Sequence, residues 1–345
     1  MPALVVAGIL ALAVGLTFVG RPGPSDQPPA TPSAVAVAGS TAPVAASSAP
    51  APSAPASPPP VPPSPSPSAR ASPTVPPTPP APGRVLVTRD VPFTPAVPCG
   101  SGRCRMRLDV WHPATKAGWP VVVSLHGRPR TRADMEPIAR LLVAEGAVVF
   151  NADYRGGARV ERGYPMAFED AACAVRFARE HAATYGGDPS RIVLVGHSFG
   201  TYVGSIVALD GDAYDGACLA DGGSAEPDAF VGLAGSYHWH DQPIWTTFFG
   251  ARLSSARARW RDGDPHSHIG GNPDSAWWFV TERTDPVLDP DSSSEFHEAL
   301  LDAGYESDLR TLDGSGHFTI LRLAGDARTA ADVVAEAAGM AAGTP

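Results

Sequence analysis

Lysine is almost absent from this chain of 345 residues, in which Lys116 is the only one. Its 26 basic residues are outnumbered by 35 acidic ones, and the formal net charge is −9. No basic stripe or polybasic tail supplies the phosphate contacts that nucleic-acid binding requires. A glycine-rich phosphate loop and a dinucleotide fingerprint are also missing. We therefore expect no nucleic-acid partner and no cofactor.

Large apolar side chains are missing from residues 21–83, which are almost entirely Pro, Ala, Ser, Thr, Val and Gly. Such a segment cannot bury enough apolar surface to offset the ordering of its backbone, and its prolines favour the extended polyproline II conformation. We expect a semi-rigid, disordered linker over residues 21–83. Residues 84–345 are long enough for one large domain with a sizeable core.

The N-terminal residues 3–20 form an uncharged apolar run. As a helix this run would be about 27 Å long, close to the thickness of the hydrocarbon layer of a bilayer. Residues 1–20 are therefore expected to be a signal peptide or a membrane anchor. Either alternative predicts an extracellular or cell-surface protein, and the second would tether it to the membrane through residues 3–20.

Cysteine is scarce, with four residues in the whole chain. Cys99 and Cys104 flank the tetrapeptide GSGR, whose glycines allow the chain to reverse, so we predict a disulfide between them. No second Cys or His pair stands at zinc-like spacing from these two. Cys173 lies in a helical pattern and Cys218 in an apolar run; each suits a small buried hydrophobe, and a second disulfide between them is the alternative.

Short apolar runs alternate with longer helical patterns over residues 84–345, which predicts a parallel sheet covered by helices. Strands are expected within residues 84–93, 104–113, 121–127, 147–155, 191–198, 217–223, 230–237, 277–285 and 308–312. Helices are expected within residues 135–146, 167–187, 201–209 and 292–304. An aromatic insert at residues 238–260 is expected to form a cap, because insertions in such sheets tend to lie over the carboxyl ends of the strands.

The segment RIVLVGHSFG, residues 191–200, places Ser198 between two glycines at the end of a predicted strand and directly before a predicted helix. This is the context of a nucleophile elbow. A serine hydroxyl needs a base to remove its proton, and the base needs a third group to orient it. Asp285 and His317 follow later strands in the required order, with Asp289 and Asp221 as alternative acids.

Acyl transfer also needs backbone N–H groups that stabilise the oxyanion. The amide of Phe199 is one candidate, and the loop after residues 121–127 supplies Gly127 and Arg128 as the others. Pro129 has no N–H, which favours Arg128. His126 is expected to be structural. The pairs His238/His240 and His266/His268 form only a weak metal pattern, and we expect no metal.

The insert is rich in aromatic residues that could line a substrate pocket or belong to the core. Trp239, Trp245 and Phe248 are the candidate pocket residues. Because aromatic side chains at such spacing are as often ordinary core, both alternatives stay open.

Several motifs in serial order resemble those of the α/β-hydrolase superfamily, in its esterase and lipase branch near the hormone-sensitive-lipase and carboxylesterase-like groups. They are HG at 126–127, NADYR at 151–155, GGDPSRIVLVGHSFG at 186–200, TDPVLDP at 284–290 and GSGHF at 314–318. The resemblance implies the α/β-hydrolase fold, with a mostly parallel central sheet, helices on both faces and a small cap insertion. One departure is HGRP, where many relatives have further glycines after the histidine.

Carried over residue by residue, the resemblance implies Ser198 as nucleophile, Asp285 as acid and His317 as base. The implied activity is that of an exported serine hydrolase that cleaves small carboxylic esters through an acyl-enzyme. The alternative is a peptidase or amidase of the prolyl-oligopeptidase type, although the chain lacks a propeller-sized N-terminal domain. A binding module with an inert elbow is a third reading, which the apparently complete triad disfavours.

Overall fold

The computed structural model describes residues 80–239, 242–314, 316–322 and 324–340. The expected signal or anchor segment, residues 1–20, and nearly all of the expected linker, residues 21–83, therefore lie outside the described residues. Within the described ranges, no helix combines the length and the apolar character that crossing a membrane demands.

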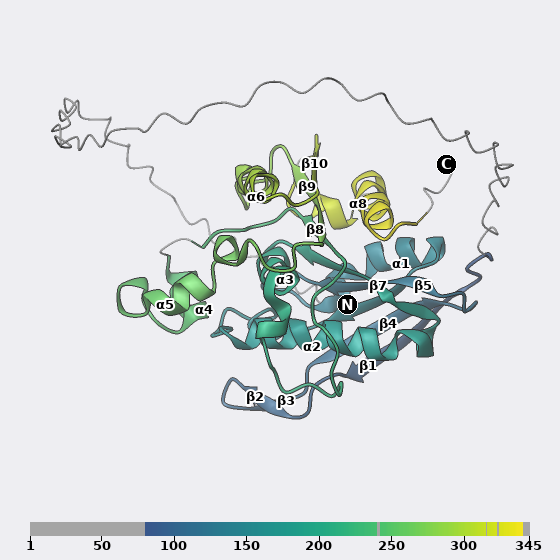
Figure 1. The fold of residues 1–345 in the computed structure, drawn as a ribbon, viewed down its shortest axis with the longest axis horizontal. Coiled ribbons are helices and arrows are strands. Elements are labelled where there is room, and N and C mark those ends of the chain that lie inside the picture. The colour runs from purple at the N-terminus through teal and green to yellow at the C-terminus, as the bar shows by residue number, and fades with distance from the viewer. Residues whose placement is uncertain (1–79, 240–241, 315, 323, 341–345) are drawn as a thin grey trace, which may run out of the picture. The chain divides into compact units, whose positions relative to one another are not determined.

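The described domain is organised around an eight-stranded sheet with the strand order β1-β4-β6-β5-β7-β8-β9-β10 (Figure 1). Only β4 runs antiparallel to its neighbours, so the remaining pairs from β6 to β10 are parallel. The strands are β1 (Val85–Pro92), β4 (Arg107–Pro113), β5 (Trp119–Leu125), β6 (Val148–Ala152), β7 (Gly187–His197), β8 (Ala229–Leu233), β9 (Ala276–Glu282) and β10 (Ser307–Leu312). The predicted mostly parallel sheet is thus confirmed.

Helices cover both faces of this sheet, because its central strands are apolar on both sides. One core cluster lies under α1 (Glu136–Glu145) and α8 (Ala324–Ala337). The other lies under α2 (Met166–His181), α3 (Phe199–Asp210) and α6 (Asp291–Asp302). Figure 1 shows α1 and α2 on opposite sides of the strands. The shorter helices are α4 (Pro243–Phe249), α5 (Arg257–Asp262) and α7 (Thr319–Arg322), and 3-10 turns span Arg132–Met135, Ala182–Tyr185, Gly211–Ala213, Leu253–Ser255 and Pro265–His268.

The aromatic insert forms α4 and α5 between β8 and β9, and Figure 1 shows both helices to one side of the sheet. Their aromatic side chains pack on the first turns of α3: Trp245 and Phe248 contact the ring of Tyr202, at centroid distances of 4.7 and 5.9 Å. The predicted cap insertion therefore rests on the helix that follows Ser198.

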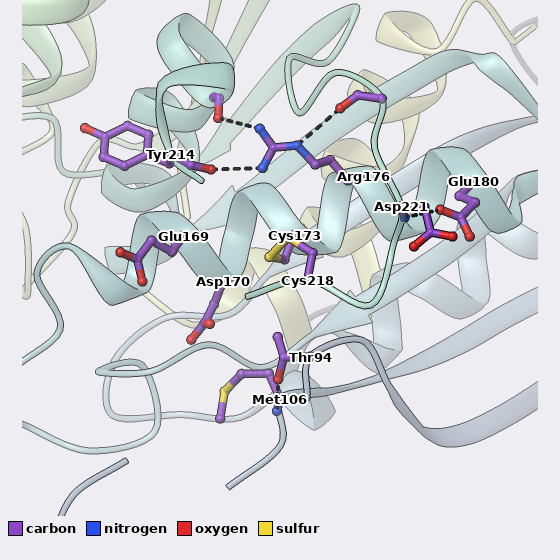
Figure 2. Close-up of a disulfide and its surroundings, with 12 residues drawn as sticks. Thr94, Met106, Glu169, Asp170, Cys173, Arg176, Glu180, Tyr214, Cys218 and Asp221 are labelled. Carbon is purple, nitrogen blue, oxygen red and sulfur yellow. Dashed lines mark hydrogen bonds between the residues drawn. A yellow bond between two sulfur atoms is a disulfide. The ribbon is translucent and has the colours of Figure 1, made fainter. Parts of the chain in front are cut away.

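The predicted strand at residues 217–223 is wrong, because this segment is a mostly exposed loop. In the sheet β8 pairs directly with β7, so no place is left for another strand between them. A disulfide joins Cys218 in this loop to Cys173 of α2, and the backbone N–H of Asp221 donates to Glu180 (Figure 2). The apolar character of the run reflects this attachment to α2.

A two-stranded hairpin of β2 (Val97–Cys99) and β3 (Gly102–Cys104) lies apart from the main sheet. Gly100 adopts a left-handed conformation, with φ of +56°, in its turn. The disulfide predicted from the sequence joins Cys99 to Cys104 across this hairpin, with their Cα atoms 5.8 Å apart.

Candidate active site

Ser198 stands at the junction of β7 and α3 with a backbone φ of +55°, a conformation that costs energy in a residue with a side chain. The two flanking glycines make this turn sterically feasible. A Cβ on Gly196 would lie 2.5 Å from the carbonyl carbon of Gly200, and a Cβ on Gly200 would lie 2.4 Å from the carbonyl oxygen of Leu125. The nucleophile elbow predicted from the sequence is therefore a turn that only glycine permits on both sides.

A chain of two hydrogen bonds links Ser198 to His317 and Asp285. Nε2 of His317 lies 2.7 Å from Oγ of Ser198, and its Nδ1 lies 2.6 Å from Oδ2 of Asp285. An ionised carboxylate can only accept, so Nδ1 carries the proton and Nε2 is free to accept from the serine hydroxyl. His317 is only 2% exposed and Ser198 8%. The arrangement allows the imidazole to act as the base of the serine.

The electrostatics favour an ionised Asp285. Burial opposes its ionisation, but the bond from His317 and the backbone N–H groups of Leu288 and Val287 outweigh this effect and lower its pKa. The alternative acids are engaged elsewhere: Asp289 is exposed and accepts the backbone N–H of Asp291, whereas Asp221 belongs to the loop at residues 217–223. Asp285 is therefore the carboxylate that orients His317.

His197 supports this arrangement, and no sequence signal singled it out. Its buried Nε2 lies 3.0 Å from the backbone carbonyl oxygen of His317, so the ring donates to the loop that carries the base. Burial, reinforced by the nearby His317, lowers the pKa of His197 to about 3 and keeps the ring neutral. This residue is the variable position of Gly-x-Ser-x-Gly, where the pattern itself specifies no side chain.

The loop after β5 packs directly against Ser198. A Cβ on Gly127 would lie 2.9 Å from Cβ of Ser198, so only glycine fits at this approach. His126 holds the loop, as expected of a structural residue: its carbonyl accepts from the hydroxyl of Tyr154 at 2.7 Å, and the two rings stack 4.8 Å apart. The amide of Phe199 lies at the first position of α3, where N–H groups lack partners within the helix.

A cavity of about 410 Å³ opens onto Ser198. Of the predicted pocket residues, Trp245 lines it, whereas Phe248 is fully buried behind Phe199 and Trp239 packs edge-on against Trp260. Sequence reasoning missed most of its wall, which is formed by residues that follow β8 and β9 and by the first turn of α6. The lining residues are Arg128, Ser198, Phe199, Gly235, Ser236, Gln242, Ile244, Trp245, Val287, Leu288, Asp289 and Ser292.

Histidine pairs in the cap region are used in packing. The rings of His238 and His266 stack 4.1 Å apart, and Nδ1 of His268 lies 3.1 Å from a carboxylate oxygen of Asp210. His240 lies outside the described residues. In the part of the chain that the structure describes, no three potential metal ligands gather closely enough to hold an ion.

Comparison with models of known protein families gives a match to this chain. A family model described as BD-FAE, a hormone-sensitive-lipase-like α/β-hydrolase family, matches residues 108–300. The matched region extends from β4 to α6 and includes Ser198 and Asp285, while His317 lies beyond it.

Among curated proteins, carboxylesterase NlhH of Mycobacterium tuberculosis is 36% identical over 102 residues, 28% of this chain and 31% of the relative. A probable isoprenylcysteine alpha-carbonyl methylesterase of Oryza sativa subsp. japonica is 27% identical over 241 residues, 62% of this chain and 54% of the relative. The chain thus spans about a third to a half of the length of these relatives.

Two solved structures show the same fold. A truncated carbohydrate esterase from gut microbiota superposes with a TM-score of 0.61 at 16% identity, covering 74% of this chain and 96% of the other. Esterase 2 of Thermogutta terrifontis, with butyrate bound, superposes with a TM-score of 0.54 at 19% identity, covering 68% and 88%.

Proposed function

Because this chain belongs to the BD-FAE family of hormone-sensitive-lipase-like α/β-hydrolases, we propose that it is an exported serine hydrolase that cleaves carboxylic esters of small molecules. The observation that carries the proposal is the hydrogen-bond chain from Asp285 through His317 to Ser198, beside a cavity large enough for a small ester. The relatives named carboxylesterase and methylesterase support an ester as the bond that this chain cleaves.

In the acylation step, Oγ of Ser198 attacks the carbonyl carbon of the ester as its proton passes to Nε2 of His317. The carbonyl oxygen becomes an oxyanion, which the amides of Phe199 and Arg128 stabilise. When the tetrahedral intermediate collapses, the alcohol leaves and takes the proton from Nε2. The acyl group remains on the serine oxygen, and Asp285 stabilises the imidazolium while it exists.

Deacylation repeats the sequence with water in place of the serine. Water loses a proton to Nε2 of His317 and attacks the acyl carbon, and the second intermediate expels the serine oxygen, which regains the proton. The products are the carboxylic acid and the regenerated enzyme. Because all groups are supplied by the chain, this mechanism requires no cofactor.

The export part of the proposal is supported by the Cys99–Cys104 and Cys173–Cys218 disulfides, since such bridges persist in oxidising compartments and are rare in a reducing cytosol. The apolar run at residues 3–20 would then direct export or tether the protein to the cell surface. Locating the full chain by cell fractionation tests this part, which a cytosolic protein with reduced thiols would contradict.

The catalytic part is tested with the full chain, 4-nitrophenyl butyrate and a fluorophosphonate probe. Ser198→Ala is expected to abolish labelling and to lower kcat by about 10⁶. Ser205 is a buried serine two turns along the same helix, and Ser205→Ala is the matched control. This variant should keep both probe labelling and ester turnover. Labelling that survives Ser198→Ala refutes the assignment. Turnover of peptidyl 4-nitroanilides without turnover of esters would instead favour a peptidase.

A further inference from the structure

Arg128 follows Gly127 in the loop after β5, at the HGRP position where many relatives have a further glycine. It lines the cavity beside Ser198. All three of its guanidinium nitrogens, Nε, Nη1 and Nη2, are buried, and none has a hydrogen-bond partner among the described residues. Burial lowers the pKa of Arg128, the direction expected for an uncompensated cation. The group nevertheless stays charged, because an arginine does not lose its proton in proteins.

Two other guanidinium groups in the buried part of the domain, those of Arg155 and Arg176, have acceptors within the chain. Arg155 binds Asp170 through Nε and Nη2, each at 2.8 Å, and Arg176 donates to the backbone carbonyl of Tyr214 at 2.9 Å. Glu161 acts on Arg128 only through its charge, with no ion pair between them within 4.0 Å. Arg128 differs from Arg155 and Arg176 because its five N–H donors have no acceptor in the part of the chain that the structure describes.

Aromatic rings hold the guanidinium in place without satisfying its donors. Its central carbon lies 4.9 Å from the ring centroid of Phe199 and 5.8 Å from that of Phe248. Cation–π contacts of this kind stabilise the charge through the face of the guanidinium plane. Aromatic rings offer no oxygen acceptor to these N–H groups, so the donors of Arg128 stay unsatisfied at the edge of the cavity that the residue lines.

We infer that Arg128 binds a carboxylate of the substrate, so that the preferred substrates of the proposed esterase are esters that also carry a carboxylate, such as half-esters of short dicarboxylic acids. The planar fork of a guanidinium matches a carboxylate with two parallel hydrogen bonds. Arg128 is the one cation among the described lining residues, which favours a singly charged group over a phosphate dianion. Asp289, the other charged lining residue, is exposed.

The inference rests on the proposed function, and it is tested by the ratio of kcat/KM for matched anionic and neutral esters. Monoethyl glutarate is paired with ethyl pentanoate for a carboxylate on the acyl side. Likewise 4-acetoxybenzoate is paired with 4-acetoxytoluene for the alcohol side. All are assayed with the full chain in a pH-stat. We expect the wild-type ratio to exceed that of Arg128→Met by about 10- to 100-fold in at least one pair.

Methionine keeps the apolar contacts with Phe199 and Phe248 but removes the donors, and Arg128→Lys, which keeps the charge, should restore part of the ratio. Because the backbone N–H of residue 128 serves both esters of a pair, a displaced loop lowers both rates and leaves the ratio unchanged. Equal ratios in wild type and Arg128→Met for both pairs would overturn the inference and leave Arg128 as a packing residue.

A binding measurement keeps the inference testable if Arg128→Met does not fold. In the Ser198→Ala full chain, calorimetric titration should give a Kd for monoethyl glutarate at least tenfold below that for ethyl pentanoate; equal values would refute the inference. Persistent esterase activity in Ser198→Ala would reject the proposed function instead.

Discussion

The Cys173–Cys218 bridge closes the part of the chain that carries Ser198, since β7 and α3 both lie between its two cysteines. Cross-linking restricts the unfolded chain, and in the chain-entropy model this effect grows with the length of the closed loop. The sequence separations are 45 residues for this bridge and 5 for Cys99–Cys104. At 25 °C the model assigns about 4 kcal/mol to the longer loop and about 2 kcal/mol to the shorter one.

Replacing both Cys173 and Cys218 with alanine should therefore lower the free energy of unfolding about twice as much as replacing Cys99 and Cys104. For a domain of this size, with a urea m-value of about 3 kcal/mol/M, the midpoints should fall by about 1.3 M and about 0.7 M, respectively. Equilibrium urea unfolding of the oxidised proteins, followed by far-UV circular dichroism, measures both differences. The folded variants should retain the proposed esterase activity, because neither bridge contacts the cavity at Ser198.

Loss of packing is a separate effect, because Cys173 is buried and its truncation leaves a small void. Cys218→Ala alone isolates the cross-link, since Cys218 is only partly buried and its removal breaks the bridge while the Cys173 side chain remains. Cys218→Ala should lower the free energy of unfolding nearly as much as the double substitution does. If Cys218→Ala costs less than loss of the hairpin bridge, the loop-length argument is refuted.

Two further predictions concern the histidines of the site. Asp285→Asn should lower kcat for 4-nitrophenyl butyrate by about 10⁴, since His317 loses its acceptor, whereas Asp289→Asn should lower it less than tenfold; the reverse order would identify Asp289 as the acid. His197 stays neutral in the folded protein down to about pH 3, while the unfolded chain takes up its proton below about pH 6.5. Stability is therefore lost as the pH falls, and between pH 7 and 5 wild type should lose about 2 kcal/mol more than His197→Gln. Urea unfolding at the two pH values measures this difference, and parallel losses would show that His197 is protonated in the folded state.

Periodicity and glycine placement were enough to predict most of the elements, because they are local properties. Neighbouring residues alone predict the alternation of buried strands and amphipathic helices. They also predict the elbow at Ser198. The strand expected at residues 217–223 was wrong, since a short apolar run looks the same whether it enters a sheet or attaches to a helix through Cys218. Only the pairing of β7 with β8 decided between the two.

The cavity was the least predictable part of the site. Trp239, Trp245 and Phe248 have similar character in the sequence, yet only Trp245 lines the space beside Ser198. Which aromatic residue faces a cavity depends on how α4 packs against α3, and no local pattern records that packing. The positioning role of His197 was hidden for the same reason, since its partner stands 120 residues away.

From the sequence alone it was possible to predict the class of fold, the candidate set of Ser198, Asp285 and His317, and the hairpin disulfide, because each depends on residue type and spacing along the chain. The tertiary structure decided which acid meets His317, which cysteines pair across the loop, and whether the arginine of HGRP finds a partner. These depend on distances between segments that are remote in sequence. For Arg128, the structure turned a departure from a motif into a buried charge with no acceptor among the described residues.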